Sequence, residues 1–236
     1  MANPEIISSL TESKTVKDIS NILCDPNSFH PTADRVDSLG NYIPWQGCTI
    51  IMPADSKFLL QIIYNRLKEK DIIREYVALL PPSSYHITLR GIRERFKCQN
   101  GKEYNEYIIS KYEKMCELNK LFEKSDIDII GFDFDIKSVN KAPYAGLSLH
   151  FDDAKDKEKI LREFEAIAVN NLDLPKKEQD WHLSLGYFYK KVGKKEQKLI
   201  REAVKDALNV NDGIYTLYFS KPMVCHFRSL DQFVKL

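Results

Sequence analysis

Residues 85–89 read YHITL and residues 181–185 read WHLSL, and these two stretches are the basis for predicting the fold. After its aromatic residue, each stretch has a histidine, an aliphatic residue, a hydroxyl residue and a leucine, a group of four that we call a tetrad. Side chains at positions i and i+2 of a β-strand point to the same face. We therefore expect each strand to present an imidazole and a hydroxyl on one face and to bury its aliphatic side chains on the other.

The sequence before each tetrad repeats the same order of elements. In the first copy, a strand over residues 48–52 and an apolar-periodic helix precede the tetrad, and in the second copy a strand over residues 145–151 and a helix precede it. From the middle of the first strand to the histidine there are 36 positions in one copy, Ile50 to His86, and 35 in the other, Leu147 to His182. A unit that occurs twice predicts a pseudo-symmetric fold in which equivalent side chains lie opposite each other.

The remaining segments predict a mixture of helices and strands. We expect a leading helix over residues 4–23 and an ordered loop over 24–47, where prolines, glycines and short polar residues interrupt the periodicity. The later elements follow the same periodicity rules and are a helix over 104–122, a strand over 127–136, a helix over 194–208, and strands over 214–219 and 223–228. Such a mixture favours the α+β class, with antiparallel rather than continuous parallel pairing.

The composition excludes several classes of function. The 236 residues are 43% hydrophobic and 29% charged, and 35 basic against 34 acidic residues leave a net charge of +1. Proteins that bind long nucleic acids usually carry a strong basic excess, so we expect a small nucleotide or a short RNA as ligand. The five cysteines show no metal-type spacing, which indicates reduced thiols. The sequence shows no leader-like start and no apolar run of membrane-spanning length, so we expect a cytoplasmic chain. It also shows no glycine-rich phosphate loop, so we expect no cofactor.

The two tetrads suit phosphate chemistry. One imidazole can take a proton from the nucleophile while the other donates one to the leaving oxygen, because the ordinary pKa of histidine, about 6.5, lies near working pH. Thr88 and Ser184 would hydrogen-bond the nonbridging phosphate oxygens. The alternative is that His86 and His182 are ordinary core or surface histidines, but the recurrence of the whole pattern in matched contexts favours a paired site. The sequence leaves open which histidine is the acid and which is the base.

On these residues, the chain resembles the 2H phosphoesterase superfamily, the two-histidine enzymes with the cyclic phosphodiesterase or RNA ligase-like fold. The resemblance covers about Cys48 to Tyr189 and depends almost wholly on the tetrads. It implies a duplicated, two-lobed fold in which antiparallel sheets flank a central cleft and helices lie outside. It also implies that His86 and His182 are catalytic, that Thr88 and Ser184 bind phosphate, and that no metal is needed. Members of the superfamily act on 2′,3′-cyclic phosphates, 2′-5′ linkages and related nucleotide esters.

The resemblance also suggests how the chain is divided. We expect an extension over residues 1–47 and a phosphoesterase domain over 48–236, with lobe 1 at about 48–100, a helical insertion at about 101–125 and lobe 2 at about 126–236. Because of the extension and the insertion, the substrate cannot be inferred from that of any one member of the superfamily. A 2′,3′-cyclic phosphate, a 2′-5′ oligoadenylate or RNA end, and a cyclic nucleotide signal all remain open. A noncatalytic nucleotide- or RNA-binding module is the alternative from another class, and no obligate protein partner is evident.

Four further residues are weaker candidates for substrate binding. Arg90 continues the face of the first tetrad and could reach a phosphate oxygen, although a solvated arginine at a strand end is the simpler interpretation. Tyr42 and Trp45 precede the first strand and Tyr144 precedes its counterpart, so any of them could stack on a nucleobase. Aromatic residues that anchor the core or a loop are the simpler interpretation for all three.

Histidines outside the tetrads invite a metal-binding interpretation that the spacing does not favour. His150 and His226 lie on expected strands, but the sequence has no His-x-His, HExxH or Cys/His cluster. No carboxylate falls within either tetrad. We therefore expect no metal site.

Overall fold

The structure is a computed structural model that describes residues 19–28, 34–126, 129–135, 146–150, 155–176, 181–209 and 214–236. Within these ranges the chain forms two antiparallel sheets and five α-helices. Most of the leading helix expected over residues 4–23 lies outside them. The α+β class with antiparallel pairing is confirmed.

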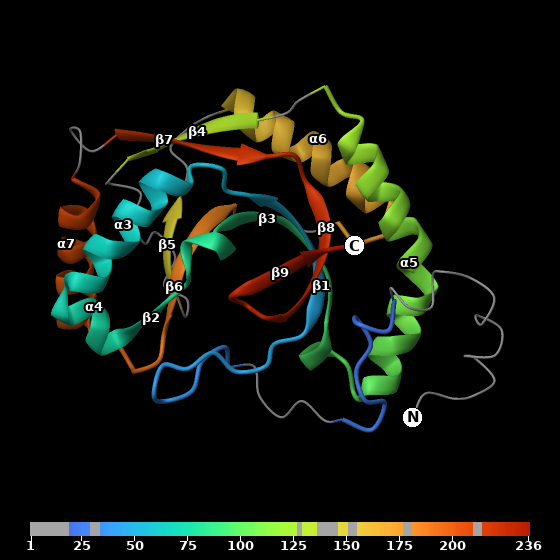
Figure 1. Cartoon of the computed structure of the whole chain (residues 1–236), viewed down its shortest axis with the longest axis horizontal. Coiled ribbons are helices and arrows are strands. Elements are labelled where there is room, and N and C mark those ends of the chain that lie inside the picture. The colour runs from blue at the N-terminus through green and yellow to red at the C-terminus, as the bar shows by residue number, and fades with distance from the viewer. Residues whose placement is uncertain are drawn as a thin grey trace.

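The larger sheet has seven strands and curls through the middle of the molecule (Figure 1). Its strands, in spatial order, are β2 (Val77–Leu79), β6 (His182–Phe188), β3 (His86–Glu94), β1 (Gly47–Pro53), β8 (Met223–Ser229) and β9 (Gln232–Lys235), with β5 (Gly146–His150) also paired to β6. The smaller sheet pairs β4 (Ile129–Asp135) with β7 (Ile214–Ser220). An isolated bridge between Ala54 and Phe219 connects it to the end of β1.

The two copies of the predicted unit have the same pairing register. In the first copy β1 and β3 are antiparallel and Met52 pairs with Ile87, and in the second β5 and β6 are antiparallel and Leu149 pairs with Leu183. In both copies the register shifts by one residue at the leucine that ends the tetrad, which is the pattern of a β-bulge. The predicted duplication is thus present in the backbone hydrogen bonding, including its irregularity.

The helices lie in two groups on either side of the larger sheet (Figure 1). One group contains α3 (Lys57–Glu69), α4 (Asp71–Tyr76) and α7 (Lys194–Leu208), which contact one another. The other contains α5 (Gly101–Glu123) and α6 (Lys155–Leu172). The bounds of α7 agree with the sequence-based prediction, and α5 begins three residues earlier than expected because Asn100 caps it by accepting a hydrogen bond from the Glu103 amide at 3.0 Å.

The sequence did not predict the shortest elements. The strands β2 and β9 and the helix α4 have three, four and six residues, too few to show a clear period. The segment before the first tetrad contains a 3-10 helix, η1 (Pro82–Ser84), and another, η2 (Arg95–Lys97), follows β3. The strand β3 extends five residues beyond the first tetrad, to Glu94.

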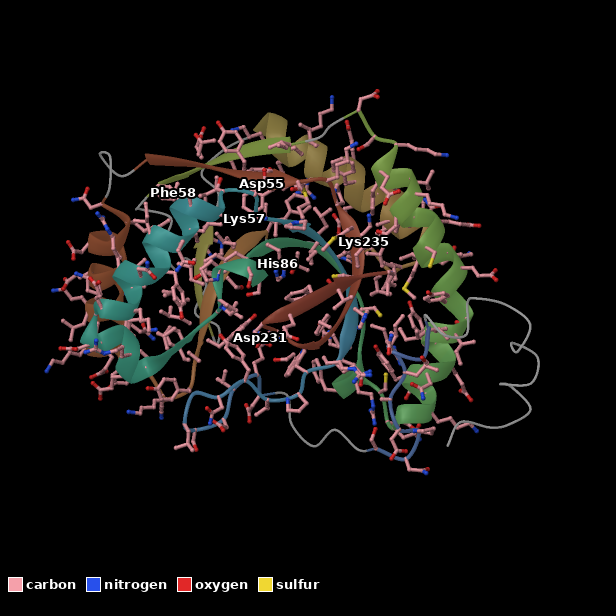
Figure 2. The ribbon with its side chains drawn as sticks, in the orientation of Figure 1. Asp55, Lys57, Phe58, His86, Asp231 and Lys235 are labelled. Carbon is pink, nitrogen blue, oxygen red and sulfur yellow. The ribbon has the colours of Figure 1, made fainter. Side chains whose placement is uncertain are left out.

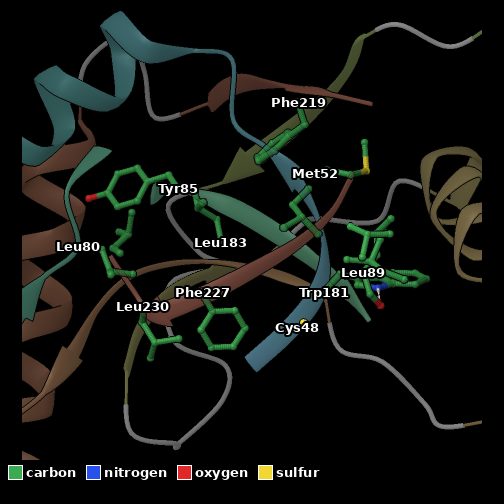
Figure 3. Close-up of a cluster of buried hydrophobic side chains, with 14 of the residues drawn as sticks. Cys48, Met52, Leu80, Tyr85, Leu89, Trp181, Leu183, Phe219, Phe227 and Leu230 are labelled. Atoms are coloured by element: carbon green, nitrogen blue, oxygen red, sulfur yellow. Dashed lines mark hydrogen bonds between the residues drawn. The ribbon is translucent and has the colours of Figure 1, made fainter. Parts of the chain in front are cut away.

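The aliphatic residues of the tetrads form the centre of the hydrophobic core, as predicted. All four have no exposed surface: Ile87, Leu89, Leu183 and Leu185. Figure 3 shows Leu89 and Leu183 within this cluster, together with Trp181, whose indole N–H donates to the Leu89 carbonyl at 3.4 Å. Burial of each aliphatic side chain contributes about 1.5–3 kcal/mol. This burial fixes the orientation of both strands and therefore the direction in which their polar side chains point.

No helix among the described residues combines the length and the apolar character that a bilayer crossing requires.

Candidate active site

The two tetrads lie side by side on adjacent strands. The strands β3 and β6 are antiparallel, and the residues in register are Ile87 and Leu183, which follow the two histidines. One step to either side places His86 opposite Ser184 and Thr88 opposite His182, since antiparallel neighbours pair in opposite order. Directly opposed side chains on one face of a sheet are about 5 Å apart at Cβ. The polar residues of both tetrads therefore form one compact group on the face away from the core.

This group lines a cavity of about 410 Å³. The volume is within the range of small-molecule sites. Figure 2 shows His86 near the middle of the molecule, and its ring packs against that of Phe233 of β9 at a steep angle, with ring centroids 4.4 Å apart. The lining combines the tetrad side chains with basic residues of β3 and of the segment before β1, and with aromatic and aliphatic residues; its members include His86, Thr88, His182, Ser184, Arg35, Trp45, Arg90, Arg93, Tyr187, Phe227 and Phe233.

The hydrogen bonds of His86 define its tautomer. Its Nδ1 lies 2.6 Å from the carbonyl oxygen of Ser84, which can only accept, so Nδ1 carries the proton and donates it. In the neutral ring, Nε2 then holds the lone pair and accepts from the hydroxyl of Thr88 at 3.1 Å. Burial lowers the pKa of His86 to about 4, against the opposing effect of the Ser84 carbonyl, and the charge of His182 lowers it further. His86 is therefore a neutral imidazole at pH 7, with a basic nitrogen beside Thr88.

His182 has different neighbours. His150 of β5 is directly opposite it in the β5–β6 register, and the two ring centroids are 5.4 Å apart. His150 is buried, and its Nε2 lies 3.2 Å from the hydroxyl of Ser148. In the equivalent register of the first copy, the residue opposite His86 is Pro53. The pseudo-symmetry of the backbone is thus broken in the side chains, because one tetrad histidine adjoins apolar groups and the other adjoins a second imidazole.

The structure corrects the simpler interpretation of Arg90. Arg90 is not a solvated residue at a strand end but is 4% exposed, and it forms an ion pair with buried Glu165 of α6 at 3.2 Å. A second hydrogen bond goes to the carbonyl of Pro175. Arg90 does line the cavity, but its charge is largely balanced by Glu165. Its proposed contact with a phosphate remains a prediction.

The aromatic candidates differ in position. Trp45 lines the cavity and is 4% exposed, its amide donates to the Arg228 carbonyl at 2.8 Å, and its ring packs against Phe96 with centroids 4.5 Å apart. Tyr42 anchors a loop, since its hydroxyl donates to the Ala78 carbonyl at 2.8 Å and burial raises its pKa. Tyr144 lies outside the described residues. Base stacking by any of them remains a prediction.

Sequence reasoning missed Arg35 and placed His150 only among metal candidates. Arg35 lies in the loop before β1, where no periodicity indicates which side chains point inward, yet it lines the cavity. His150 lies two residues after Ser148 on a strand, the same i, i+2 pattern as a tetrad in reverse order, and this signal could have been used. In the described part of the chain, no three side chains of the metal-binding types are grouped so as to hold an ion.

Comparison with known proteins gives a fold and no family. No protein-family model matches the sequence, and no curated protein matches it. Among solved structures, the chain is similar to a conserved protein of unknown function from Agrobacterium tumefaciens str. C58, at a TM-score of 0.56 and 13% identity over 93% of this chain and 97% of that one. It is also similar to E. coli LigT complexed with phosphate, at a TM-score of 0.46 and 13% identity over 82% of this chain and 96% of that one. The first of these likenesses shows a shared fold.

Proposed function

We propose that this chain is a metal-independent phosphodiesterase that cleaves a nucleotide phosphodiester with His86 and His182 as a paired base and acid. The observation that carries the proposal is the pairing of Ile87 with Leu183, which brings two motifs of the same pattern, 96 positions apart in the sequence, to one face of one cavity. Two imidazoles and two hydroxyls on a common face are what acid–base cleavage of a phosphodiester requires.

The environment of His86 supports a division of roles between the two histidines. His86 is neutral at pH 7 and its Nε2 has a lone pair, so it acts as the base that takes a proton from water or from a ribose hydroxyl. As the new P–O bond forms and the bond to the leaving ribose oxygen breaks, protonated His182 donates its proton to that oxygen.

The hydroxyls of Thr88 and Ser184 complete the site. Each lies opposite the histidine of the other tetrad, so a phosphorus atom between the two rings is also between the two hydroxyls. Both can donate to nonbridging oxygens as negative charge develops there. For Thr88, this means exchanging its hydrogen bond to His86 for one to the substrate, which leaves the His86 nitrogen available to the nucleophile.

The substrate class follows from the resemblance of the tetrads to those of the 2H superfamily. It comprises 2′,3′-cyclic phosphates, 2′-5′ oligoadenylates or RNA ends, and cyclic nucleotide signals. A cavity of about 410 Å³ is suited to a nucleotide or a short oligonucleotide end rather than to a duplex.

The test is turnover of a panel of 2′-5′ and 3′-5′ oligonucleotides and cyclic phosphates by the wild type, His86→Ala and His182→Ala, each with and without a chelator. We expect either substitution to reduce turnover at least about a hundredfold, in line with general acid–base contributions, and the chelator to have no effect. His226→Ala is the matched control, because this histidine is on β8 outside the cavity lining and is half-buried like the other two.

Two outcomes would overturn the proposal. Loss of turnover on chelation would replace it with metal-dependent chemistry. Nucleotide binding that His86→Ala and His182→Ala abolish, without turnover of any member by the wild type, would indicate a noncatalytic binding module. Thermal unfolding of each variant separates loss of the site from loss of the fold.

A further inference from the structure

Arg35 lies in the cavity between two aromatic rings. Its guanidinium carbon is 5.4 Å from the centroid of the Trp45 ring and 4.9 Å from that of Tyr187. Cation–π contacts of this kind depend on the charge of the guanidinium and use none of its N–H groups as hydrogen-bond donors to oxygen. The Arg35 guanidinium donates no hydrogen bond to another described residue, so its N–H groups are available to a ligand.

The charge of Arg35 is not neutralised in the way that the other cations of the cavity are. Arg90 pairs with Glu165, Arg93 pairs with Glu103, and Lys97 pairs with Glu94. Within the described ranges, no carboxylate forms an ion pair with Arg35. Arg35 therefore places in the cavity a positive charge that no described carboxylate pairs with, and a concave site with protein walls concentrates its effect on an anion.

The position of Arg35 relative to the tetrads determines what kind of anion Arg35 can bind. Tyr187, which holds it, follows Ser184 by three residues on β6, roughly 10 Å of strand. This backbone separation favours contact between Arg35 and a part of the ligand other than the phosphate at the tetrad hydroxyls. A ligand with two phosphates, separated by a nucleoside, can contact both places.

We propose that Arg35 forms a second phosphate subsite and that the substrate is a nucleotide with a phosphate in addition to the one between the histidines. The guanidinium fork matches phosphate oxygens in a bidentate contact, which lysine cannot reproduce. The additional phosphate is a 5′-monoester or the next diester of an oligonucleotide. This inference rests on the proposed function, which assigns the first phosphate to the tetrads.

The test is calorimetric binding of adenosine 3′-monophosphate and adenosine 3′,5′-bisphosphate to the wild type, Arg35→Gln and Arg35→Lys. We expect the wild type to bind the bisphosphate at least about tenfold more tightly, since a charged hydrogen bond contributes that much or more. Arg35→Gln should lose this preference and bind the monophosphate as the wild type does, and Arg35→Lys should keep only part of it. The dinucleotide ApA with a 3′-phosphate, used as a third ligand, distinguishes an internal diester from a 5′-monoester.

A matched control is Arg162→Gln, because Arg162 also stacks on an aromatic ring, that of Trp181 at 5.2 Å, but lies outside the cavity lining. It should leave both affinities unchanged. The inference is wrong if the wild type binds neither nucleotide or does not prefer the bisphosphate, or if Arg35→Gln keeps the preference or weakens both ligands equally.

Comparing the binding preference with turnover separates this inference from the proposed function, and His86→Ala, which should lose turnover, allows the preference to be measured without it. If no substrate is turned over but the preference depends on Arg35, the subsite stands and the hydrolytic proposal fails. If turnover depends on the histidines but the preference is absent, only the subsite fails.

Discussion

Acidification should destabilise the folded protein through His86. Its pKa is about 4 in the folded chain, because burial disfavours the imidazolium, and about 6.5 in the unfolded chain. Between these values the unfolded chain binds a proton that the folded chain does not. The free energy of unfolding therefore decreases as the pH falls below 6.5, and this contribution is fully lost below pH 4.

The size of the effect follows from the two pKa values. The difference between 6.5 and about 4 corresponds to about 3 kcal/mol at most, of which about 2 kcal/mol is lost by pH 5. His86→Gln keeps a polar side chain that can donate to the Ser84 carbonyl but takes up no proton in this range. The variant should thus lose about 2 kcal/mol less than the wild type between pH 7.5 and pH 5.

Urea unfolding followed by tryptophan fluorescence measures this difference. Trp45 and Trp181 are 4% and 7% exposed, so both report loss of the fold. Parallel pH dependence in the wild type and His86→Gln would refute the reasoning, since it would mean that folded His86 binds its proton as readily as the unfolded residue does. The assignment of His86 as the neutral base would then fail as well.

Two further predictions concern the second copy of the repeat. Gly186→Ala should lower stability by about 1–3 kcal/mol in thermal unfolding, because the added Cβ would lie 2.5 Å from a backbone carbonyl of β2. Gly91→Ala is the control, because the atom nearest its added Cβ is a side-chain oxygen at 3.7 Å and little change is expected; equal losses in both variants would contradict this. His150→Phe keeps a ring beside His182 but removes the imidazole, so we expect kcat to fall about tenfold and the pH–rate profile to shift. An unchanged profile would show that His150 only fills space.

The parts of the site that the sequence predicted depend on local periodicity. Alternation along a strand sets which side chains share a face, so the burial of Ile87 and Leu183 and the cavity positions of His86 and His182 follow from a few adjacent residues. The duplicated order of elements then indicated that the two faces would meet.

The parts that it missed depend on contacts between distant segments. Arg90 is buried together with its ion-pair partner, Glu165. Glu165 lies 75 positions away on a helix, and no local sequence pattern indicates such a pair. Arg35 depends on the path of an irregular loop, whose inward-pointing side chains have no period. Loops and long-range ion pairs therefore mark the limit of what one sequence shows here.

The unequal neighbours of the two tetrad histidines have a consequence for the direction of the proposed reaction. A twofold-symmetric pair of imidazoles would accept a diester in either orientation, and half of the bound molecules would present the leaving group to the wrong ring. Pro53 and Phe233 beside one histidine, and His150 beside the other, make the two ends of the cradle chemically distinct. The duplicated fold therefore has two different ends at its site, so that the attacking group and the leaving group of a bound diester would meet different surroundings.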